Sequence, residues 1–280
     1  MPDSDRSPID IDVLEQHALV LRRHVVQMVG RLGQGYVQQG LGAADLFACL
    51  FFSELRFRRE EPTWPDRDRF LLSTAHNSAL FHAALAESGQ IPRETLATYC
   101  DDGSTLEVNV SERLGPLVEA TLGSLGQGLS VGLGMALAGR RHGARYRVYV
   151  VLGDGEMQEG QLWEAAMAAG SFGVDNLCLI VDRNGMQVEG DTDRVLRMEP
   201  VAAKWTSFNW AVREVDGHDL RALLGAFAWA RSTRGRPSVI VANTRVGKGV
   251  SFLEGQYGHN MKFSRDLASA ALAELDGRAS

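Results

Sequence analysis

The chain has 280 residues, 45% of them hydrophobic, and its formal net charge is −6, with basic residues scattered along the sequence. These features fit a globular protein with a large core and exclude the basic stripe of a nucleic-acid-binding protein. No apolar run is long enough to cross a membrane, the acidic N-terminus lacks the apolar centre of a secretion signal, and the 3 cysteines follow no metal or disulfide spacing, so a cytoplasmic protein is expected.

Apolar periodicity predicts mainly helices in the first half of the chain and alternating strands and helices in the second. The first half should hold helices over residues 11–29, 43–55, 76–87 and 123–139, a glycine-rich loop over residues 30–42 and a strand over residues 69–73. The second half should hold strands over residues 147–152, 177–181, 210–215 and 238–242, helices over residues 159–169 and 220–231, and at most one polar helix over residues 265–280. This order predicts an α/β fold with a doubly wound, mostly parallel sheet flanked by helices. Since no repeat or linker interrupts the chain, residues 1–280 are expected to form a single domain.

The most informative segment is the strand-like run that ends in Gly153, Asp154 and Gly155. Asn184 follows the next predicted strand, so a carboxylate and an amide oxygen should lie at the carboxyl ends of neighbouring parallel strands, where ligands of open α/β sheets bind. Such oxygen ligands suit Mg²⁺, the glycines allow a phosphate to approach, and the following helix offers free N–H groups. The pattern predicts a metal-bound diphosphate; the alternative is a plain turn in which Asp154 only caps a helix.

Three longer motifs, together with this pattern, resemble the transketolase family of thiamin diphosphate-dependent enzymes. They are residues 123–130 (GSLGQGLS), residues 153–166 (GDGEMQEGQLWEAA) and residues 247–252 (GKGVSF). The resemblance runs in order from about Leu21 to His259 and therefore covers most of the chain. It implies the thiamin diphosphate-binding fold, with the whole chain as the diphosphate-binding domain.

The resemblance also assigns roles to individual residues. Mg²⁺, or Ca²⁺ in its place, is expected to bind Asp154, Asn184 and the main-chain carbonyl of Met186. The expected cofactor-binding residues are Gly123, Leu125, Gly126, Gln127, Gly153, Asp154, Gly155 and Asn184. The expected catalytic residues are His76, His259 and Glu159, the last at a subunit interface near the cofactor.

Each of these assignments has a structural alternative. Glu159 could serve only as a favourable charge at a helix start, and Glu164 further along that helix is a weaker candidate. The glycines could serve only close helix packing, and an isolated histidine is more often structural than catalytic. Lys248 could contact phosphate or simply face water.

Three positions depart from the family pattern. Tyr36, Asn109 and Asn243 stand where the family usually has histidines that bind donor hydroxyls or assist proton transfer. The diphosphate half of the expected site is therefore intact, whereas its sugar half is changed. Because a site that hydrogen-bonds a hydroxyl rejects analogues that lack it, such replacements predict altered substrate choice.

The resemblance ends where full-length transketolases continue into a pyrimidine-binding domain, which carries the glutamate that activates the cofactor. This implies a separate C-terminal-like partner subunit, an assembly of two copies of each chain, and no activity for this chain alone. The expected reaction moves a two-carbon ketol unit from a ketose-type donor to an aldehyde or other acceptor. Two alternatives remain: a subunit of a thiamin-dependent oxoacid decarboxylase or dehydrogenase, and a non-catalytic scaffold paralogue.

Overall fold

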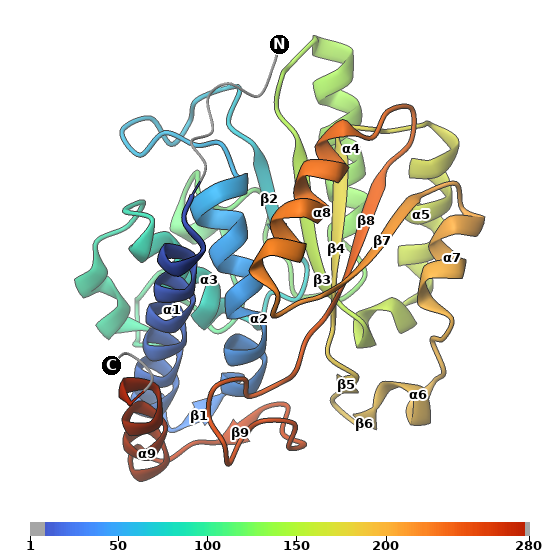
Figure 1. Ribbon diagram of the computed structural model, residues 1–280. Coiled ribbons are helices and arrows are strands. Elements are labelled where there is room, and N and C mark those ends of the chain that lie inside the picture. The colour runs from blue at the N-terminus through green and yellow to red at the C-terminus, as the bar shows by residue number, and fades with distance from the viewer. Residues whose placement is uncertain (1–8, 278–280) are drawn as a thin grey trace.

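The structure, a computed structural model, describes residues 9–277 of the chain. Within these residues five strands form one sheet in the order β2-β3-β4-β8-β7 (Figure 1). The strands are β2 (Arg69–Leu72), β3 (Val148–Gly153), β4 (Leu177–Arg183), β7 (Ala211–Asp216) and β8 (Ser238–Asn243). All neighbouring pairs are parallel, so the predicted α/β fold is confirmed and the carboxyl ends of the strands lie along one edge of the sheet.

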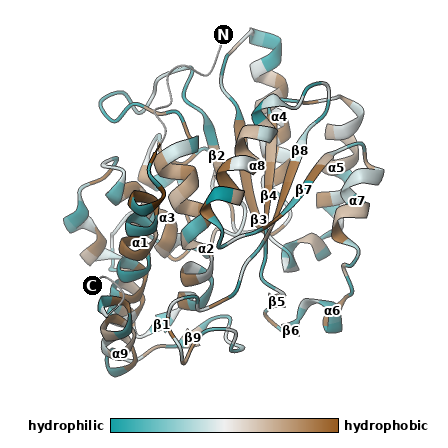
Figure 2. Cartoon of the chain, in the orientation of Figure 1, coloured by the Kyte–Doolittle hydropathy of each residue, from teal (hydrophilic) through white to brown (hydrophobic). Residues whose placement is uncertain are grey.

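Helices cover both faces of the sheet. One layer contains α1 (Ile11–Leu32), α2 (Val37–Cys49), α3 (Ser78–Glu87) and α8 (Leu220–Ser232), and the other contains α4 (Gly128–His142), α5 (Gly160–Ser171) and α7 (Val201–Ser207) (Figure 1). The central strands β3, β4 and β8 are therefore buried on both sides, and Figure 2 shows them as the apolar centre of the fold. A parallel strand buried on both faces has a continuous apolar sequence, which is why these strands were predictable.

Short elements connect the main ones near the carboxyl edge of the sheet. The two-residue strands β1 (Gln34–Gly35) and β9 (Met261–Lys262) pair antiparallel, as do β5 (Met186–Gln187) and β6 (Gly190–Asp191). The first pair joins the segment after α1 to the segment before α9 (Arg265–Asp276). The remaining elements are η1 (Leu50–Glu54), η2 (Arg93–Thr98), η3 (Glu112–Leu114), η4 (Gly155–Gln158) and α6 (Thr192–Val195).

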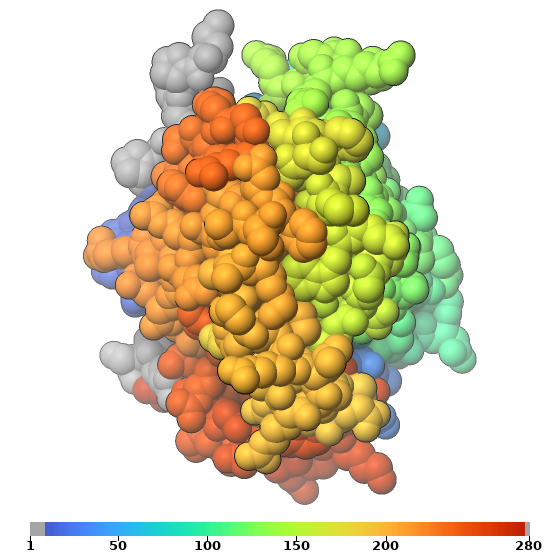
Figure 3. All heavy atoms as spheres, turned by 90° about the vertical axis from the view of Figure 1, so that its right-hand side faces the viewer, coloured from blue at the N-terminus to red at the C-terminus, as the bar shows by residue number. Residues whose placement is uncertain are grey.

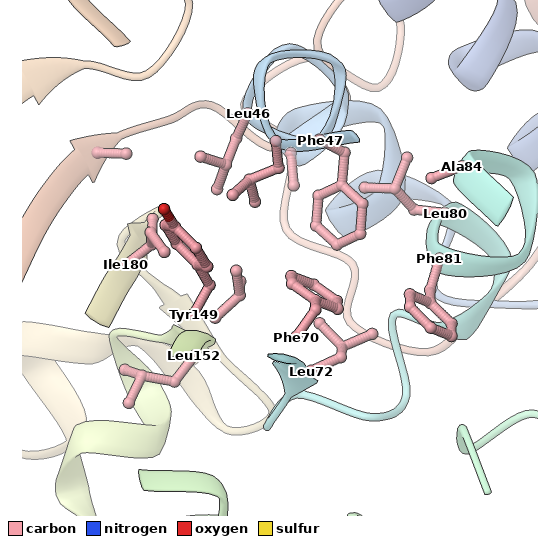
Figure 4. Close-up of a cluster of buried hydrophobic side chains, with 14 of the residues drawn as sticks. Leu46, Phe47, Phe70, Leu72, Leu80, Phe81, Ala84, Tyr149, Leu152 and Ile180 are labelled. Carbon is pink, nitrogen blue, oxygen red and sulfur yellow. The ribbon is translucent and has the colours of Figure 1, made fainter. Parts of the chain in front are cut away.

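Aromatic side chains pack the edge strand β2 against α2 and α3 (Figure 4). The ring of Phe70 lies 5.6 Å from that of Phe81 in a stacked arrangement and 5.8 Å from that of Phe47 in an edge-on arrangement. Such pairs add to the stabilisation that comes from apolar burial alone. Because α2 and α3 are fixed on β2 in this way, the residues that follow β2 and precede α3 have a defined position at the edge of the sheet.

The prediction of a glycine-rich loop over residues 30–42 is wrong, because α2 already begins at Val37. Its glycines permit close packing: a Cβ at Gly40 would lie 2.8 Å from the Val25 side chain, and one at Gly42 would lie 2.9 Å from the Arg245 carbonyl oxygen. The helix predicted over residues 123–139 begins only at Gly128. The residues before it form a loop at the site described below.

Among the helices of residues 9–277, none has the length and apolar character needed to cross a membrane. The N-terminal segment for which no secretion signal was expected, residues 1–8, and the last residues of the predicted polar helix, 278–280, lie outside the described residues.

Replacing Gly170 of α5 with alanine should destabilise the fold, because its Cβ would lie 1.7 Å from the main-chain oxygen of Phe208, which cannot move far. We expect a loss of about 3 kcal/mol in the free energy of unfolding, measured by denaturant titration. The matched control is Gly225→Ala in α8, where a Cβ would meet nothing within 4 Å. That variant should be about 0.5–1 kcal/mol more stable, and equal effects of the two substitutions would contradict the packing described for α5.

Candidate functional site

A cavity of about 190 Å³ opens at the carboxyl ends of β3 and β4. Its lining residues come from the ends of these strands, from the segments that follow β2, β3 and β4, and from three distant segments. They are Gln39, Thr74, His76, Asn77, Leu125, Gly153, Gly155, Glu156, Gln158, Glu159, Asp182, Asn184, Met186, Gln187, Val188 and His259. This is the edge of the sheet at which ligands of open α/β folds bind. The cavity therefore brings together residues that the sequence suggested independently of one another.

The carboxyl group of Asp154 lies directly after β3 and is 4% exposed. Its Oδ2 accepts hydrogen bonds from the Gly185 N–H at 2.9 Å and the Thr192 hydroxyl at 3.0 Å, and its Oδ1 accepts one from the Gly155 N–H at 3.1 Å. Burial, together with the charge of Asp182, raises its pKa to about 6. A buried carboxyl in this state lacks a balancing positive charge, which a bound cation would supply.

The loop after β4 brings two further oxygen atoms to the same place. Asn184 and Met186 both line the cavity, and the Asn184 Oδ1 accepts a hydrogen bond from the Met186 N–H at 3.0 Å. A Cβ at Gly155 would lie 3.4 Å from the Met186 carbonyl oxygen, so that carbonyl faces the turn of Asp154. No group of three or more His, Cys, Asp or Glu side chains that could hold a metal occurs in the part of the chain that the structure describes. A carboxylate, an amide oxygen and a carbonyl oxygen fit a hard cation such as Mg²⁺.

The sequence analysis missed Glu156, a buried residue that ties together three segments around the cavity. Its carboxyl accepts hydrogen bonds from the Ser73 hydroxyl at the end of β2 and from the Gly126 N–H at 2.8 Å. The pKa of Glu156 is raised to about 7, mainly because its carboxyl is buried. A glutamate after a Gly-Asp-Gly turn usually faces solvent, so no local signal in the sequence predicted its burial.

Asp182 was also missed, because it lies inside a strand that reads as apolar. Its carboxyl accepts hydrogen bonds from the Thr244 hydroxyl and from the Asn184 side-chain amide, the latter at 3.3 Å. Burial raises its pKa above the ordinary value. Asp182 thus holds the side chain of Asn184 at the end of β4.

The loop of residues 123–127 touches the cavity at one point and supports it at another. Leu125 lines the cavity, and Gly126 has a φ of +81°, where a Cβ would lie 2.7 Å from Cβ of Glu159. Gly123 lies beside Asn109, with 3.9 Å between its ideal Cβ and the Asn109 Cγ. Gly123 and Gln127 do not line the cavity itself.

The two candidate histidines meet at one side of the cavity although they are far apart in the sequence. The ring centroids of His76 and His259 are 5.2 Å apart, and the Tyr36 ring lies 4.5 Å from the first and 5.2 Å from the second. Burial, and secondarily His259, lowers the pKa of His76 to about 4, and burial lowers the pKa of His259. Both imidazoles are therefore neutral at pH 7.

The other residues singled out in the sequence differ in whether they line the cavity. Glu159 lines the cavity and is exposed at the start of α5, whereas Glu164 is exposed further along that helix and does not line it. Lys248 lies 3.7 Å from a carboxylate oxygen of Glu254, and the Asn243 side chain accepts a hydrogen bond from Arg183 at 2.8 Å. Neither Lys248 nor Asn243 is among the residues that line the cavity.

Comparison with known proteins supplies the context of this site. The family model described as "Transketolase, thiamine diphosphate binding domain" matches residues 14–267. The chain is 39% identical over 264 residues to the "6-deoxy-6-sulfo-D-fructose transketolase subunit SqwG" of Clostridium sp. (strain MSTE9), a match that covers 94% of this chain and 96% of that protein. It is 34% identical over 247 residues to a subunit of the apulose-4-phosphate transketolase of Phocaeicola vulgatus, with 88% of each chain covered.

Solved structures show the same similarity in three dimensions. The fold matches the crystal structure of transketolase from Campylobacter jejuni with a TM-score of 0.90 and 29% sequence identity. The match covers 96% of this chain but 43% of that one, so the chain spans less than half of the length of that enzyme.

Replacing Glu156 with glutamine should change how the stability of the ligand-free chain depends on pH. The carboxyl has a pKa of about 7 in the folded chain against an ordinary 4.5, so the folded state binds this proton more tightly than the unfolded state. The resulting stabilisation is complete below pH 4.5 and is lost as the pH rises to about 7, a change of roughly 3 kcal/mol. Denaturant titrations between these pH values should show this loss in the wild type and a loss smaller by about 3 kcal/mol in Glu156→Gln, which keeps the contribution of the Asp154 carboxyl.

The control for this prediction is Glu164→Gln, an exposed position on α5. It should keep the pH dependence of the wild type. A Glu156→Gln variant with an unchanged pH dependence would mean that the buried carboxyl is already ionised in the folded chain.

Proposed function

The chain belongs to the transketolase family through its thiamine diphosphate binding domain, and from this premise we propose that it is the cofactor-binding subunit of a two-chain transferase. The enzyme would move a two-carbon ketol unit from a ketose-type donor to an aldehyde or another acceptor. The single observation that carries the proposal is the position of the buried Asp154 carboxyl against the loop of Asn184 and Met186, two residues that line the cavity at the edge of the sheet.

Mg²⁺, or Ca²⁺ in its place, would be held by Asp154, Asn184 and the Met186 carbonyl. The unbalanced burial of the Asp154 carboxyl and the all-oxygen donor set support this assignment. The diphosphate would lie against Gly153 and Gly155, where a side chain would fill the space that the group needs. Leu125 and its loop neighbours Gly123, Gly126 and Gln127 would contact the rest of the cofactor. Thiamin diphosphate, when bound, supplies the electron sink for the reacting carbon.

His76 and His259 would act on the donor, because both line the cavity and both are neutral at pH 7. A neutral imidazole can donate a hydrogen bond from one nitrogen and accept one at the other, so it can hold a hydroxyl or transfer its proton. Glu159 is exposed at the rim of the same cavity and is therefore accessible to a second chain. We assign it to the contact between the subunits near the cofactor.

We propose that a second, C-terminal-like subunit completes the active site and carries the pyrimidine-binding domain, with this chain as a single diphosphate-binding domain. The names of two relatives, each called a transketolase subunit, support this arrangement, as does the match to less than half of a solved transketolase. The helix α5 follows Glu159 and lies with α7 on the face that Figure 3 shows. Met167 within this helix is 57% exposed and Phe172 at its end is 55% exposed, and a partner could cover both apolar side chains.

The family resemblance also suggests the assembly, the cellular compartment and the kind of sugar donor. An assembly of two copies of each chain is proposed, in the cytoplasm. The relatives named above differ in the sugar that their names state, so the family accommodates different donors. The changed positions Tyr36 and Asn109, which lie near the histidines and near Gly123, support a donor that differs from that of common transketolases.

Replacing Asp154 with asparagine should weaken the Mg²⁺-dependent binding of thiamin diphosphate by about 100-fold or more, because the variant lacks the one carboxylate of the proposed metal site. Isothermal titration of the two-chain complex with Mg²⁺ and cofactor would measure this loss. Asp102→Asn, in an exposed loop, is the control and should bind the cofactor like the wild type. Equal affinity of Asp154→Asn and the wild type would rule out the metal assignment.

Ketose consumption should require both subunits, Mg²⁺ and thiamin diphosphate. We expect no turnover by this chain alone and cofactor-dependent turnover after it is co-purified with a transketolase-like C-terminal subunit from the same organism. Decarboxylation of a 2-oxoacid without transfer to an acceptor would instead favour the oxoacid decarboxylase alternative. A complex that neither binds the cofactor nor turns over would favour a scaffold.

A further inference from the structure

Side chains from three segments form a cluster at one side of the cavity, and two of them are the expected catalytic residues His76 and His259. We call it the ring corner: it consists of Tyr36, Gln39, His76, Asn77 and His259. The three rings lie within 5.2 Å of one another, centroid to centroid, and the Gln39 side-chain amide lies 2.9 Å from Nδ1 of His259. Gln39 starts from α2, whereas His259 precedes β9, so the corner joins segments that are far apart in the sequence.

Two carbonyl oxygens of the ring corner are buried without a hydrogen-bond partner. They are Oε1 of Gln39 and Oδ1 of Asn77, on residues that are 7% and 4% exposed and that both line the cavity. Buried acceptors of this kind are nearly always satisfied in a functional state, because leaving one unpaired costs free energy. The corner therefore needs a ligand that brings hydrogen-bond donors.

The charges around the ring corner further limit the chemical groups that it can bind. Among the described residues that line the cavity there is no lysine or arginine. Burial lowers the pKa of His76 and of His259, so neither ring carries a positive charge at pH 7. A phosphate, sulfonate or carboxylate would find no charge partner here, whereas an uncharged hydroxyl would find two acceptors.

The amide of Gln39 also determines which nitrogen of His259 carries the proton. The side-chain NH₂ group can only donate, so Nδ1 of His259 accepts and the proton of the neutral ring is on Nε2. This tautomer leaves an N–H donor on the side of the ring away from Gln39. A ligand hydroxyl in the corner can then donate to Gln39, and a second ligand oxygen can accept from Nε2 of His259.

We propose that Gln39 is a specificity-determining residue, whose Oε1 accepts a hydrogen bond from a hydroxyl at the uncharged end of the donor and whose NH₂ group holds His259 in the Nε2–H tautomer. This inference rests on the proposed function, since it assumes that the donor enters this cavity. It places any anionic group of the donor outside the ring corner. Gln39 is also a polar side chain in the half of the site where Tyr36 stands in place of the family histidine.

The test compares two donors that differ by one hydroxyl, 3-hydroxypyruvate and pyruvate, with the complete two-chain enzyme, Mg²⁺ and thiamin diphosphate. Gln39→Leu should lower kcat/KM for 3-hydroxypyruvate by about tenfold or more relative to the value for pyruvate, because only the former donor has the hydroxyl. The exposed Gln256→Leu on the same side of the molecule is the matched control and should leave both values unchanged. An unchanged ratio between the two donors in Gln39→Leu would overturn the proposal. So would a weaker binding of thiamin diphosphate with that ratio preserved, because the amide would then serve the cofactor.

A second measurement is independent of turnover. In the ¹⁵N-labelled complex, two-bond ¹H–¹⁵N correlations should show the Nε2–H tautomer of His259 in the wild type. Gln39→Glu, which keeps the size of the side chain but replaces the donor by an acceptor, should shift the proton to Nδ1. If the wild type uses neither donor, the proposed function fails; a tautomer that changes in Gln39→Glu would still support the role of Gln39, and one that does not change would refute it.

Discussion

The hydrogen bonds of the Asp154 carboxyl, which connect the end of β3 to the loop after β4, are the interactions on which the rest of the site depends. The Asp154 carboxyl receives N–H groups from its own turn and from Gly185, and a hydroxyl from Thr192. These three donors hold the loop of Asn184 and Met186 against the turn after β3 without neutralising the carboxyl, whose pKa is raised by burial. The fold thus places the loop that carries Asn184 and Met186 against the Asp154 carboxyl and leaves a deficit of positive charge there. Because this negative charge is buried and uncompensated, the position favours the binding of a cation.

Much of this arrangement could be predicted from sequence because it depends on local signals. Buried parallel strands read as apolar runs, glycines mark the turns after them, and parallel neighbours end at one edge. Asp154 and Asn184 therefore had predictable positions once β3 and β4 were recognised as neighbours. The α/β fold is confirmed for the same reason, as is the transketolase-type subunit: the motifs of the family are contiguous stretches on these elements.

The features that escaped prediction depend on contacts between distant segments. Gly40 and Gly42 looked like a loop, but they are glycines because Val25 and the Arg245 main chain approach α2 closely. Glu156 looked exposed, but Ser73 and Gly126 come from other elements to satisfy it. Gln39 had no motif at all, and its position beside His259 depends on contacts between distant segments, which include the pairing of β1 with β9 and the hydrogen bonds of the Gln38 amide to the Leu253 and Gln256 carbonyls. A single sequence contains the residues that make these contacts, but it does not show which of them lie close together in the fold.

The pairing of β1 with β9 has a consequence for how the protein is made and how it can change. The half of the site proposed to bind the metal lies within residues 153–192, which precede the last segment of the chain. The ring corner requires residues 34–39 and 259–262 together, so it closes last, when almost the whole polypeptide is present. If Gln39 selects the donor as proposed, mutations in these two segments can alter the choice of sugar over evolutionary time while the cofactor half stays constant. One scaffold could in this way give rise to enzymes for several carbohydrates.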